Sequence, residues 1–391
     1  MRGSMRWYSV ISTRRSFGLD VEAAARSLEQ KLDGVEPDLV LVFLSHHHAA
    51  HLEATAAYLL RRFDRAVLMA VTGAGVIADG IEVEGEPAVS MVAAVLPGVE
   101  LRPFHVTAAE VQYLSTHPAY WHKKLPIPDD ADPCFLLFPE PFSCDGEKLS
   151  ESMDRAWPKA SKIGGLASGA RHPGQNKLLV HRVVHDRGAI GVAMWGNIEM
   201  EPLIASGAMP LGPEFRITKS EGQLALELDG VPALDALERM VGDVPTDVRD
   251  AFVSAPVVGV RRAAVDGGFV IRNVVGVDRS RNAVGVALDI FPGDMLRFHI
   301  RNPVSAREQL IQLLEPVNRA AGAVVISCIA RGEEFFGERN HDANVVHSVF
   351  PDMPFGGFFA NGELGPVAGR TWTHGYTTVL GLFREKTPSK G

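Results

Sequence analysis

The first half of the chain alternates apolar segments of two kinds. Apolar residues recur at helical spacing over residues 19–32, and continuous apolar runs of strand length follow at 38–45 and 66–71, with a second helical segment at 52–63 between them. A continuous apolar run is typical of a strand that is buried on both faces, as in a parallel sheet. The order helix, strand, helix, strand therefore predicts an α/β fold.

Shorter strands, several next to glycines, fill the rest of the chain. Two amphipathic helices are predicted within residues 225–252, and strands follow at 255–260, 269–277, 283–288, 295–300 and 323–328. Ser305 followed by Glu308 matches a capping box, which predicts a helix over 305–314. Residues 341–349 form another short predicted helix.

This pattern predicts two consecutive mixed-sheet α/β domains that pack together. We place the first domain at residues 5–235 and the second at 236–386, with tails at 1–4 and 387–391. A chain of 391 residues, 46% of them hydrophobic, is long enough for two cores.

The charge balance limits the partners. A formal net charge of -8 is unsuited to binding nucleic acid or an anionic membrane surface, so we expect a small molecule or another protein. Three cysteines, Cys134, Cys144 and Cys328, are an odd number and argue against a disulfide framework. An odd cysteine count fits a reducing compartment, so the expected location is the cytoplasm. No run approaches the roughly 20 apolar residues of a membrane helix.

The segments 326–332, 355–367 and 373–379 bring many kinds of chemical group into a short stretch. Six glycines lie between positions 356 and 375, and glycine weakens ordinary strands, so we expect tight turns or close backbone approach here. Among them are a thiol, a guanidinium, a carboxylate, an imidazole and a phenol, contributed by Cys328, Arg331, Glu363, His374 and Tyr376. This composition is typical of a functional site.

One interpretation is catalytic. Cys328 would be the nucleophile, with His374 as the base and Glu363 orienting it, an arrangement that occurs on unrelated folds. The alternative is that Cys328 is a buried free thiol that packs as a small hydrophobic side chain.

The other interpretation is binding without turnover. The planar fork of Arg331 suits both oxygens of a carboxylate, and Glu363, presented by a turn, suits an ammonium group. Alternatively, Glu363 caps a neighbouring element or pairs with Arg331. A single strand from 373 to 383 would place His374 and Tyr376 on one face, either lining a pocket or buried in the core. The predicted ligand-binding residues are Cys328, Arg331, Asn361, Glu363, His374 and Tyr376.

Metal and cofactor sites are weakly supported. His47 and His51 would share a helical face, but a zinc site needs three or four ligands. The glycine-rich segments 72–76 and 164–169 lack the Gly-Lys-Ser/Thr ending of a phosphate loop. We therefore predict neither a cofactor nor a metal.

The order of several motifs resembles the FIST family. In the first half these are residues 37–43, 72–77, 86–90, 164–168 and 191–193, and in the second half 269–278, 327–332, 356–366 and 374–377. The resemblance covers nearly the whole chain. Ala330 stands where the family pattern has glycine before the arginine.

The resemblance implies a sensory protein of signal transduction that binds a small ligand, with amino acids as the suggested ligands. Family members often carry a transmitter or F-box module, whereas this chain looks like the stand-alone form, whose output would come from a protein partner. Two rival functions stay open: a thiol-dependent enzyme using Cys328 with His374, and a protein-recognition scaffold like that of the F-box relatives.

Overall fold

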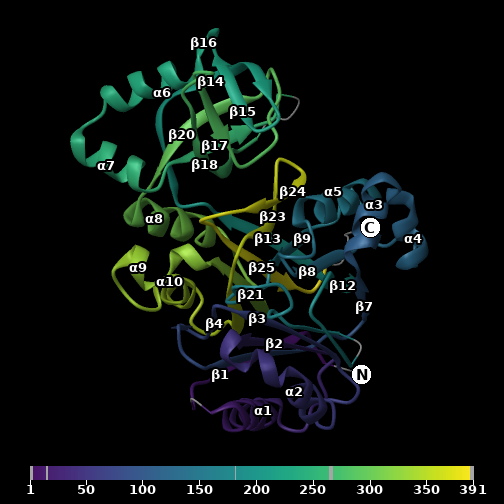
Figure 1. Cartoon of the computed structure of the whole chain (residues 1–391). Helices are drawn as coiled ribbons and strands as arrows, with labels where there is room; N and C mark the ends of the chain where they lie inside the picture. Colours follow the sequence, from purple (N-terminus) through teal and green to yellow (C-terminus); the bar gives the residue numbers. More distant parts are fainter. Residues whose placement is uncertain (1–2, 15, 181, 264–266, 388–391) are drawn as a thin grey trace. The chain divides into compact units, whose positions relative to one another are not determined.

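The structure is a computed structural model that describes residues 3–14, 16–180, 182–263 and 267–387 (Figure 1). Of the predicted tails, residues 1–2 and 388–391 lie outside the described residues. Helices and strands are mixed along the chain, and several sheets combine parallel and antiparallel pairs. The predicted α/β class with mixed sheets is confirmed.

Three six-stranded sheets share one strand order. The first runs β1 (Arg6–Ser12), β6 (Val89–Val95), β2 (Leu39–Ser45), β3 (Val67–Gly73), β10 (Leu178–Val180) and β11 (Val183–His185). The second runs β7 (Val99–Val106), β12 (Ala189–Gly196), β8 (Cys134–Pro139), β9 (Lys162–Gly165), β23 (Glu363–Val367) and β24 (Arg370–His374). The third runs β13 (Glu199–Ala205), β25 (Thr378–Arg384), β21 (Gly322–Cys328), β22 (Phe355–Ala360), β4 (Gly75–Ala78) and β5 (Ile81–Glu84).

The pairing directions repeat as well. In every sheet the third and fourth strands of this order are parallel, namely β2 with β3, β8 with β9 and β21 with β22. The strands on either side of each parallel pair are antiparallel to it. The chain therefore contains a threefold structural repeat with strands at residues 6–95, 99–196, and 199–205 with 322–384.

The three repeats exchange hairpins in a cycle. The hairpin β4–β5 of the first repeat completes the third sheet, β10–β11 of the second completes the first, and β23–β24 of the third completes the second. Each sheet thus needs chain from two repeats. Because these pairings join strands far apart in sequence, the repeat is not visible as a short sequence period.

The helices of the repeats connect the strands. They are α1 (Phe17–Leu32), α2 (Leu52–Leu59), α3 (Ala108–Thr116), α4 (Trp121–Lys124), α5 (Gly146–Ala156), α8 (Pro303–Leu314), α9 (Glu333–Phe336) and α10 (His341–Val349). The predicted capping box at Ser305 and Glu308 is wrong, because α8 begins at Pro303. The backbone N–H of Ser305 instead donates to Asn302 Oδ1 at 2.9 Å.

One hydrophobic core joins the three sheets. Phe43 from β2, Phe138 from β8 and Phe358 from β22 form a triangle, with ring centroids 5.6 to 6.2 Å apart. Edge-to-face and stacked pairs at such distances stabilise a core beyond their buried area. The triangle lies just before the carboxyl ends of the three parallel pairs.

Residues 206–309 form a separate compact unit. Its sheet runs β14 (Ala208–Glu221), β20 (Met295–Arg301), β17 (Val257–Arg261), β18 (Val270–Asp278), β19 (Ala283–Val286), β15 (Leu224–Leu228) and β16 (Val231–Pro232). Since β14 also pairs with β15, the sheet closes into an antiparallel barrel. The helices α6 (Ala233–Gly242) and α7 (Thr246–Ser254) belong to this unit. Residues 224–228, expected within the helical stretch, form strand β15.

The two compact units are not consecutive in sequence. The first unit comprises residues 1–205, 310–373 and 377–391, and the second comprises 206–309 and 374–376. The barrel is thus an insertion between β13 and β21 of the third repeat. The predicted division between residues 235 and 236 falls inside α6.

Three of the four glycines in segment 355–367 lie inside strands, and Gly362, with φ 120°, lies in the turn between β22 and β23. Gly356 and Gly357 lie inside the fully buried β22, and Gly365 lies in β23. A Cβ atom on Gly357 would lie 1.6 Å from the backbone oxygen of Val325 on β21. The expected close backbone approach is therefore confirmed here, and it occurs between paired strands.

Candidate functional site

The carboxyl ends of the parallel strands meet at the segment 166–168. The backbone N–H of Ala167 donates to Pro139 O at the end of β8, and that of Ser168 donates to Thr72 O on β3. The hydroxyl of Ser168 donates to Phe359 O on β22 and accepts from the backbone N–H of Ala74 at 2.8 Å. Strand ends from all three sheets thus lie in one place, and ligands commonly bind at the carboxyl ends of parallel strands.

A buried ion pair lies at the end of β21. Arg331, only 1% exposed, donates from Nε to Asp342 Oδ2 and from Nη2 to Asp342 Oδ1, both at 2.9 Å. This bidentate geometry is the strong form of an arginine–carboxylate pair. The sequence predicted that the guanidinium of Arg331 would bind the carboxylate of a ligand. In the structure it binds the carboxylate of Asp342 from the chain itself.

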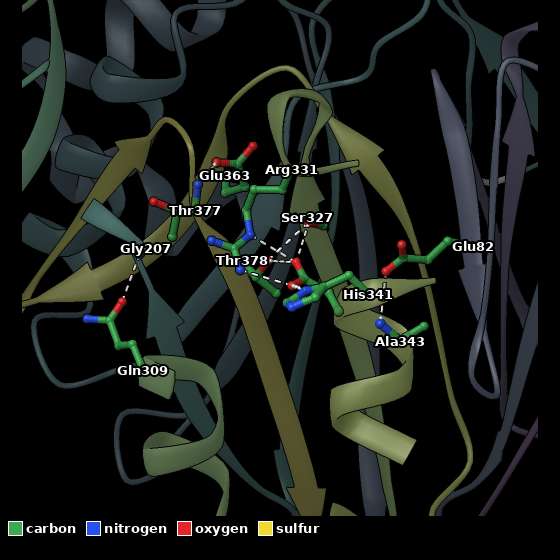
Figure 2. Close-up of polar contacts among 11 residues, drawn as sticks. Glu82, Gly207, Gln309, Ser327, Arg331, His341, Ala343, Glu363, Thr377 and Thr378 are labelled. Carbon is green, nitrogen blue, oxygen red and sulfur yellow. Dashed lines mark hydrogen bonds and ion pairs between the residues drawn. The ribbon is translucent and has the colours of Figure 1, made fainter. Parts of the chain in front are cut away.

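Further groups complete what we call the Asp342 cluster, which comprises Ser327, Arg331, His341, Asp342 and Thr378. Ser327 Oγ donates to Asp342 Oδ2 at 2.9 Å, and the Thr378 hydroxyl donates to the same oxygen. His341 Nδ1 lies 3.0 Å from Asp342 Oδ1. Figure 2 shows Ser327, Arg331, His341 and Thr378 pointing toward one another.

The cluster favours its charged form. Burial by itself favours the neutral acid, but the charge of Arg331 and the hydrogen bonds outweigh it, so the pKa of Asp342 lies well below its usual range. Burial likewise disfavours the guanidinium, yet Asp342 raises the pKa of Arg331. Asp342 also lies in the first turn of α10, where the helix dipole favours a negative charge.

Sequence reasoning missed Asp342 and His341. Both lie at the start of the correctly predicted helix 341–349, where an acidic residue commonly interacts only with the helix end. The side chain of His341 is positioned by α9, because the ring of Phe336 stacks on its ring at a centroid distance of 3.4 Å. The guanidinium of Arg331 lies 5.2 Å from the centre of the same ring.

Glu363 lies beside Cys328 and is fully buried. Its carboxyl accepts a hydrogen bond from the Cys328 thiol and from the backbone N–H groups of Gly362 at 3.3 Å and Thr377 at 3.4 Å. Burial raises the pKa of Glu363 well above its ordinary range, and these hydrogen bonds offset only part of the effect. Burial therefore favours the protonated form of this carboxyl.

The structure brings together part of the predicted set. One buried region of the first unit contains Cys328, Arg331 and Glu363. The thiol of Cys328 is hydrogen-bonded to Glu363, and the charge of Arg331 acts on both groups. Asn361 is exposed in the turn before Glu363. The expectation that a loop displays Glu363 is wrong, because it is the first residue of β23 and is buried.

His374 and Tyr376 belong to the second compact unit. The predicted single strand over 373–383 is wrong: β24 ends at His374, β25 begins at Thr378, and Tyr376 has a left-handed backbone with φ 61°. Strand alternation therefore does not place His374 and Tyr376 on one face. The ring of Tyr376 lies 4.4 Å from the guanidinium of Arg301, a cation–π contact.

The histidines after β2 do not share one helical face. Residues 46–51 form a 3₁₀ helix, in which positions four apart do not align as they would in an α-helix. His47 Nδ1 lies 3.4 Å from Ser45 Oγ, and the buried His48 pairs with Asp20 at 3.2 Å. Within the described residues, no group of three His, Cys, Asp or Glu side chains could hold a metal ion.

A third buried carboxyl, that of Glu82 on β5, lies close to α10. Glu82 accepts a hydrogen bond from the backbone N–H of Ala343 at 2.8 Å and lines a cavity of about 240 Å³ with Glu84, Glu86, Glu333 and Arg339. Burial, together with the negative charge of Asp342, raises the pKa of Glu82 to about 8. The pKa values of Glu82 and Glu363 are thus raised, whereas that of Asp342 is lowered. Neighbouring carboxyls whose pKa values are shifted in opposite directions are typical of functional sites.

The raised pKa of Glu82 makes stability depend on pH. In the unfolded chain Glu82 ionises near pH 4.5, whereas in the folded chain it stays protonated up to about pH 8. The folded state therefore loses stability as pH rises between these values, by roughly 3 kcal/mol at pH 7 for the full shift. We expect Glu82→Gln to recover about half of this at pH 7, because a buried amide is also a polar group, and to leave stability at pH 4 unchanged.

Urea unfolding between pH 4 and pH 9 tests this expectation. Glu86→Gln, on the same cavity, is the matched control. A variant Glu82→Gln whose stability follows the same pH profile as the wild type would show that Glu82 is ionised in the folded protein.

Comparison with known proteins identifies the family. Residues 38–231 match the FIST N domain and residues 233–366 match the FIST C domain. An uncharacterized protein of Mycobacterium tuberculosis (strain ATCC 25618 / H37Rv) is 29% identical over 375 residues, covering 93% of this chain and 95% of its own length. An uncharacterized protein of Mycobacterium bovis is 28% identical over 373 residues, covering 93% of this chain and 94% of its own length.

The matched regions contain most of the motifs described above, and the motif 374–377 lies beyond the second region. The regions include parts of both compact units, and the two family models meet at residues 231 and 233, at the start of α6. In the part of the chain that the structure describes, no helix is long and apolar enough to cross a membrane. The chain belongs to the FIST family, with an N-terminal and a C-terminal FIST domain.

Proposed function

We propose that this protein binds a small ligand as a sensor in signal transduction, and that the ligand-binding site is centred on Cys328 and Glu363. The family is associated with signal transduction and with small-ligand sensing, which supports the sensory role. The observation that carries the site is the fully buried Glu363 carboxyl, which accepts a hydrogen bond from the Cys328 thiol at the carboxyl end of a parallel strand and whose pKa is raised by burial. Perturbed carboxyls in such positions mark functional sites.

The surroundings of Cys328 favour binding over thiol catalysis. A nucleophilic cysteine needs a base that removes its proton, or a positive charge that stabilises the thiolate. Burial raises the pKa of Glu363 and so favours its protonated form, which cannot act as a base, and the positive charge of Arg331 is balanced by Asp342. The thiol of Cys328 acts here as a hydrogen-bond donor.

Glu363 also indicates the class of ligand. A ligand ammonium would stabilise the carboxylate and displace the proton, forming an ion pair in a site of low dielectric. Asn361 is exposed and Gly362 half-buried, so the chain just before the carboxyl is open to solvent. We propose an amino acid or a similar small amine as the ligand, with Asn361 supplying hydrogen bonds at the entrance.

In this proposal Arg331 is a positioning residue. Its ion pair with Asp342 fixes the turn after Cys328, and its charge partly offsets the cost of ionising Glu363. His374 and Tyr376 belong to the other compact unit, and the site proposed here is built from residues of the first unit alone.

The proposal predicts a specific pH dependence. Because the proton on Glu363 must leave when an ammonium binds, affinity should rise about tenfold per pH unit below the folded pKa of Glu363. Glu363→Gln mimics the protonated acid and cannot ionise, so it should fold normally and bind the ligand at least about 30-fold more weakly, with no pH dependence.

Calorimetric titration of a panel of amino acids and amines at pH 6, 7 and 8 provides the measurement, after a thermal-shift screen selects the ligand. Glu334→Gln, an exposed glutamate on α9, is the control and should behave as the wild type. If Glu363→Gln binds the selected ligand as tightly as the wild type, the ligand does not lie at this carboxyl.

A further inference from the structure

The barrel unit has an apolar cavity of its own. It measures about 650 Å³ and lies between α6, α7 and the second half of β18. A cavity of this size is in the range that accommodates organic ligands. The labels α6, α7 and β18 in Figure 1 show where these elements lie within the unit.

The cavity exists because the helices leave part of β18 uncovered. β18 pairs with β17 over residues 270–273 and then with β19 over 274–278, with an irregularity at Gly276. On either side of Gly276, Val275 and Val277 are 61% and 43% exposed, and Val253 on α7 is 65% exposed. Three large apolar side chains thus face one cavity while remaining open to water, which is costly for isolated valines.

The floor of the cavity is apolar and is part of the hydrophobic core of the barrel. Leu234 and Leu237 on α6 and Phe252 on α7 line it and belong to the barrel's hydrophobic core. A ligand chain in contact with the exposed valines would therefore extend an existing core.

The rim carries an arginine without a carboxylate partner. Arg249 donates from Nε to Val241 O at 3.0 Å and from Nη2 to Gly242 O at 3.2 Å, which holds its guanidinium at the carboxyl end of α6. It forms no ion pair with any residue that the structure describes. The other charges of the rim, Arg279 and Glu238, pair with each other at 3.4 Å. The rim therefore has one unbalanced positive charge.

We propose that this cavity binds an amphipathic carboxylate with an aliphatic chain, such as a medium-chain fatty acid. The chain would cover Val253, Val275 and Val277, and the carboxylate would accept hydrogen bonds from Arg249. An apolar cavity alone would accept neutral molecules equally well; the positioned guanidinium provides the preference for an anion. This site lies within the barrel unit and is independent of the proposed amino-acid site.

The head group is tested by titrating the full-length protein with decanoate, decanol and decylamine below their micellar concentrations. We expect saturable binding of decanoate, about tenfold tighter than decanol and tighter still than decylamine. Arg249→Gln should reduce decanoate to the affinity of decanol, and Arg249→Lys should retain most of the preference. Unchanged decanol binding in both variants shows that the cavity is intact.

The location is tested with Val275→Thr combined with Val277→Thr, which preserves side-chain shape. This double variant should bind all three probes about tenfold more weakly, whereas Val304→Thr, at an equally exposed valine on α8, should have no effect. No saturable decanoate binding, equal binding of decylamine, or unchanged binding in the double variant would overturn the proposal. So would a dimer that the double variant dissociates, because a second copy would then cover this face.

Discussion

Replacing Asp342 by alanine is expected to lower the free energy of unfolding by about 3–5 kcal/mol. Arg331 is fully buried, and Asp342 is its bidentate partner at 2.9 Å. Without that carboxylate the guanidinium charge is uncompensated in a low-dielectric interior, and Arg331 cannot lose its proton. Ser327 and Thr378 also lose the oxygen to which they donate.

Urea denaturation at pH 7 measures this loss, with Asp352→Ala, an exposed aspartate, as the control. A second variant separates the cost of an unpaired charge from the loss of packing: Arg331→Met with Asp342→Leu removes both charges and should recover about half or more of the stability. If Asp342→Ala loses less than about 1 kcal/mol, or if the double variant is less stable than Asp342→Ala, the ion pair does not have this role.

Gly357→Ala is expected to be still more destabilising, by more than about 4 kcal/mol. The new Cβ would lie 1.6 Å from the backbone oxygen of Val325 and 2.6 Å from its carbonyl carbon. A backbone atom cannot rotate away, so β21 and β22 would have to separate along their parallel pairing. These strands carry Cys328 at their carboxyl end, so the candidate site would be disturbed with them.

Gly356→Ala is the matched comparison on the same strand. Its Cβ would meet Val92 Cγ2 at 2.5 Å and Ser90 Oγ at 2.9 Å, which are side-chain atoms. We therefore expect a smaller loss, partly restored by Val92→Ala, whereas no side-chain substitution should restore Gly357→Ala. Thermal unfolding of the three variants is the measurement, and equal losses for Gly356→Ala and Gly357→Ala would contradict the role of the backbone contact.

Local patterns predicted the buried strands well. The runs that became β2, β3 and β21 are continuously apolar because each strand is buried on both faces, and this pattern can be recognised from consecutive residues alone. The glycines of this stretch predicted either tight turns or close backbone approach. At Gly357 the pairing of β22 with β21 decided for close approach, because that contact depends on a second strand.

The candidate site was predicted in part. Cys328, Arg331 and Glu363 stood out because they lie among glycines in a short stretch, and the structure places them in one buried region. Asp342 and Glu82 did not stand out, because an acidic residue at a helix start and another on a short strand are ordinary on a protein surface. Glu82 is 261 positions from Ala343, whose N–H it accepts.

The sequence by itself determined the α/β class, most of the long apolar strands and the family, because these depend on composition and on order along the chain. Only the tertiary structure decided the threefold repeat, the exchange of hairpins among its sheets and the position of the barrel as an insertion. The tertiary structure also decided that the pKa of Asp342 is lowered while those of Glu82 and Glu363 are raised. Strand pairing and pKa values both depend on groups that are distant in sequence, and burial sets how strongly charged groups interact.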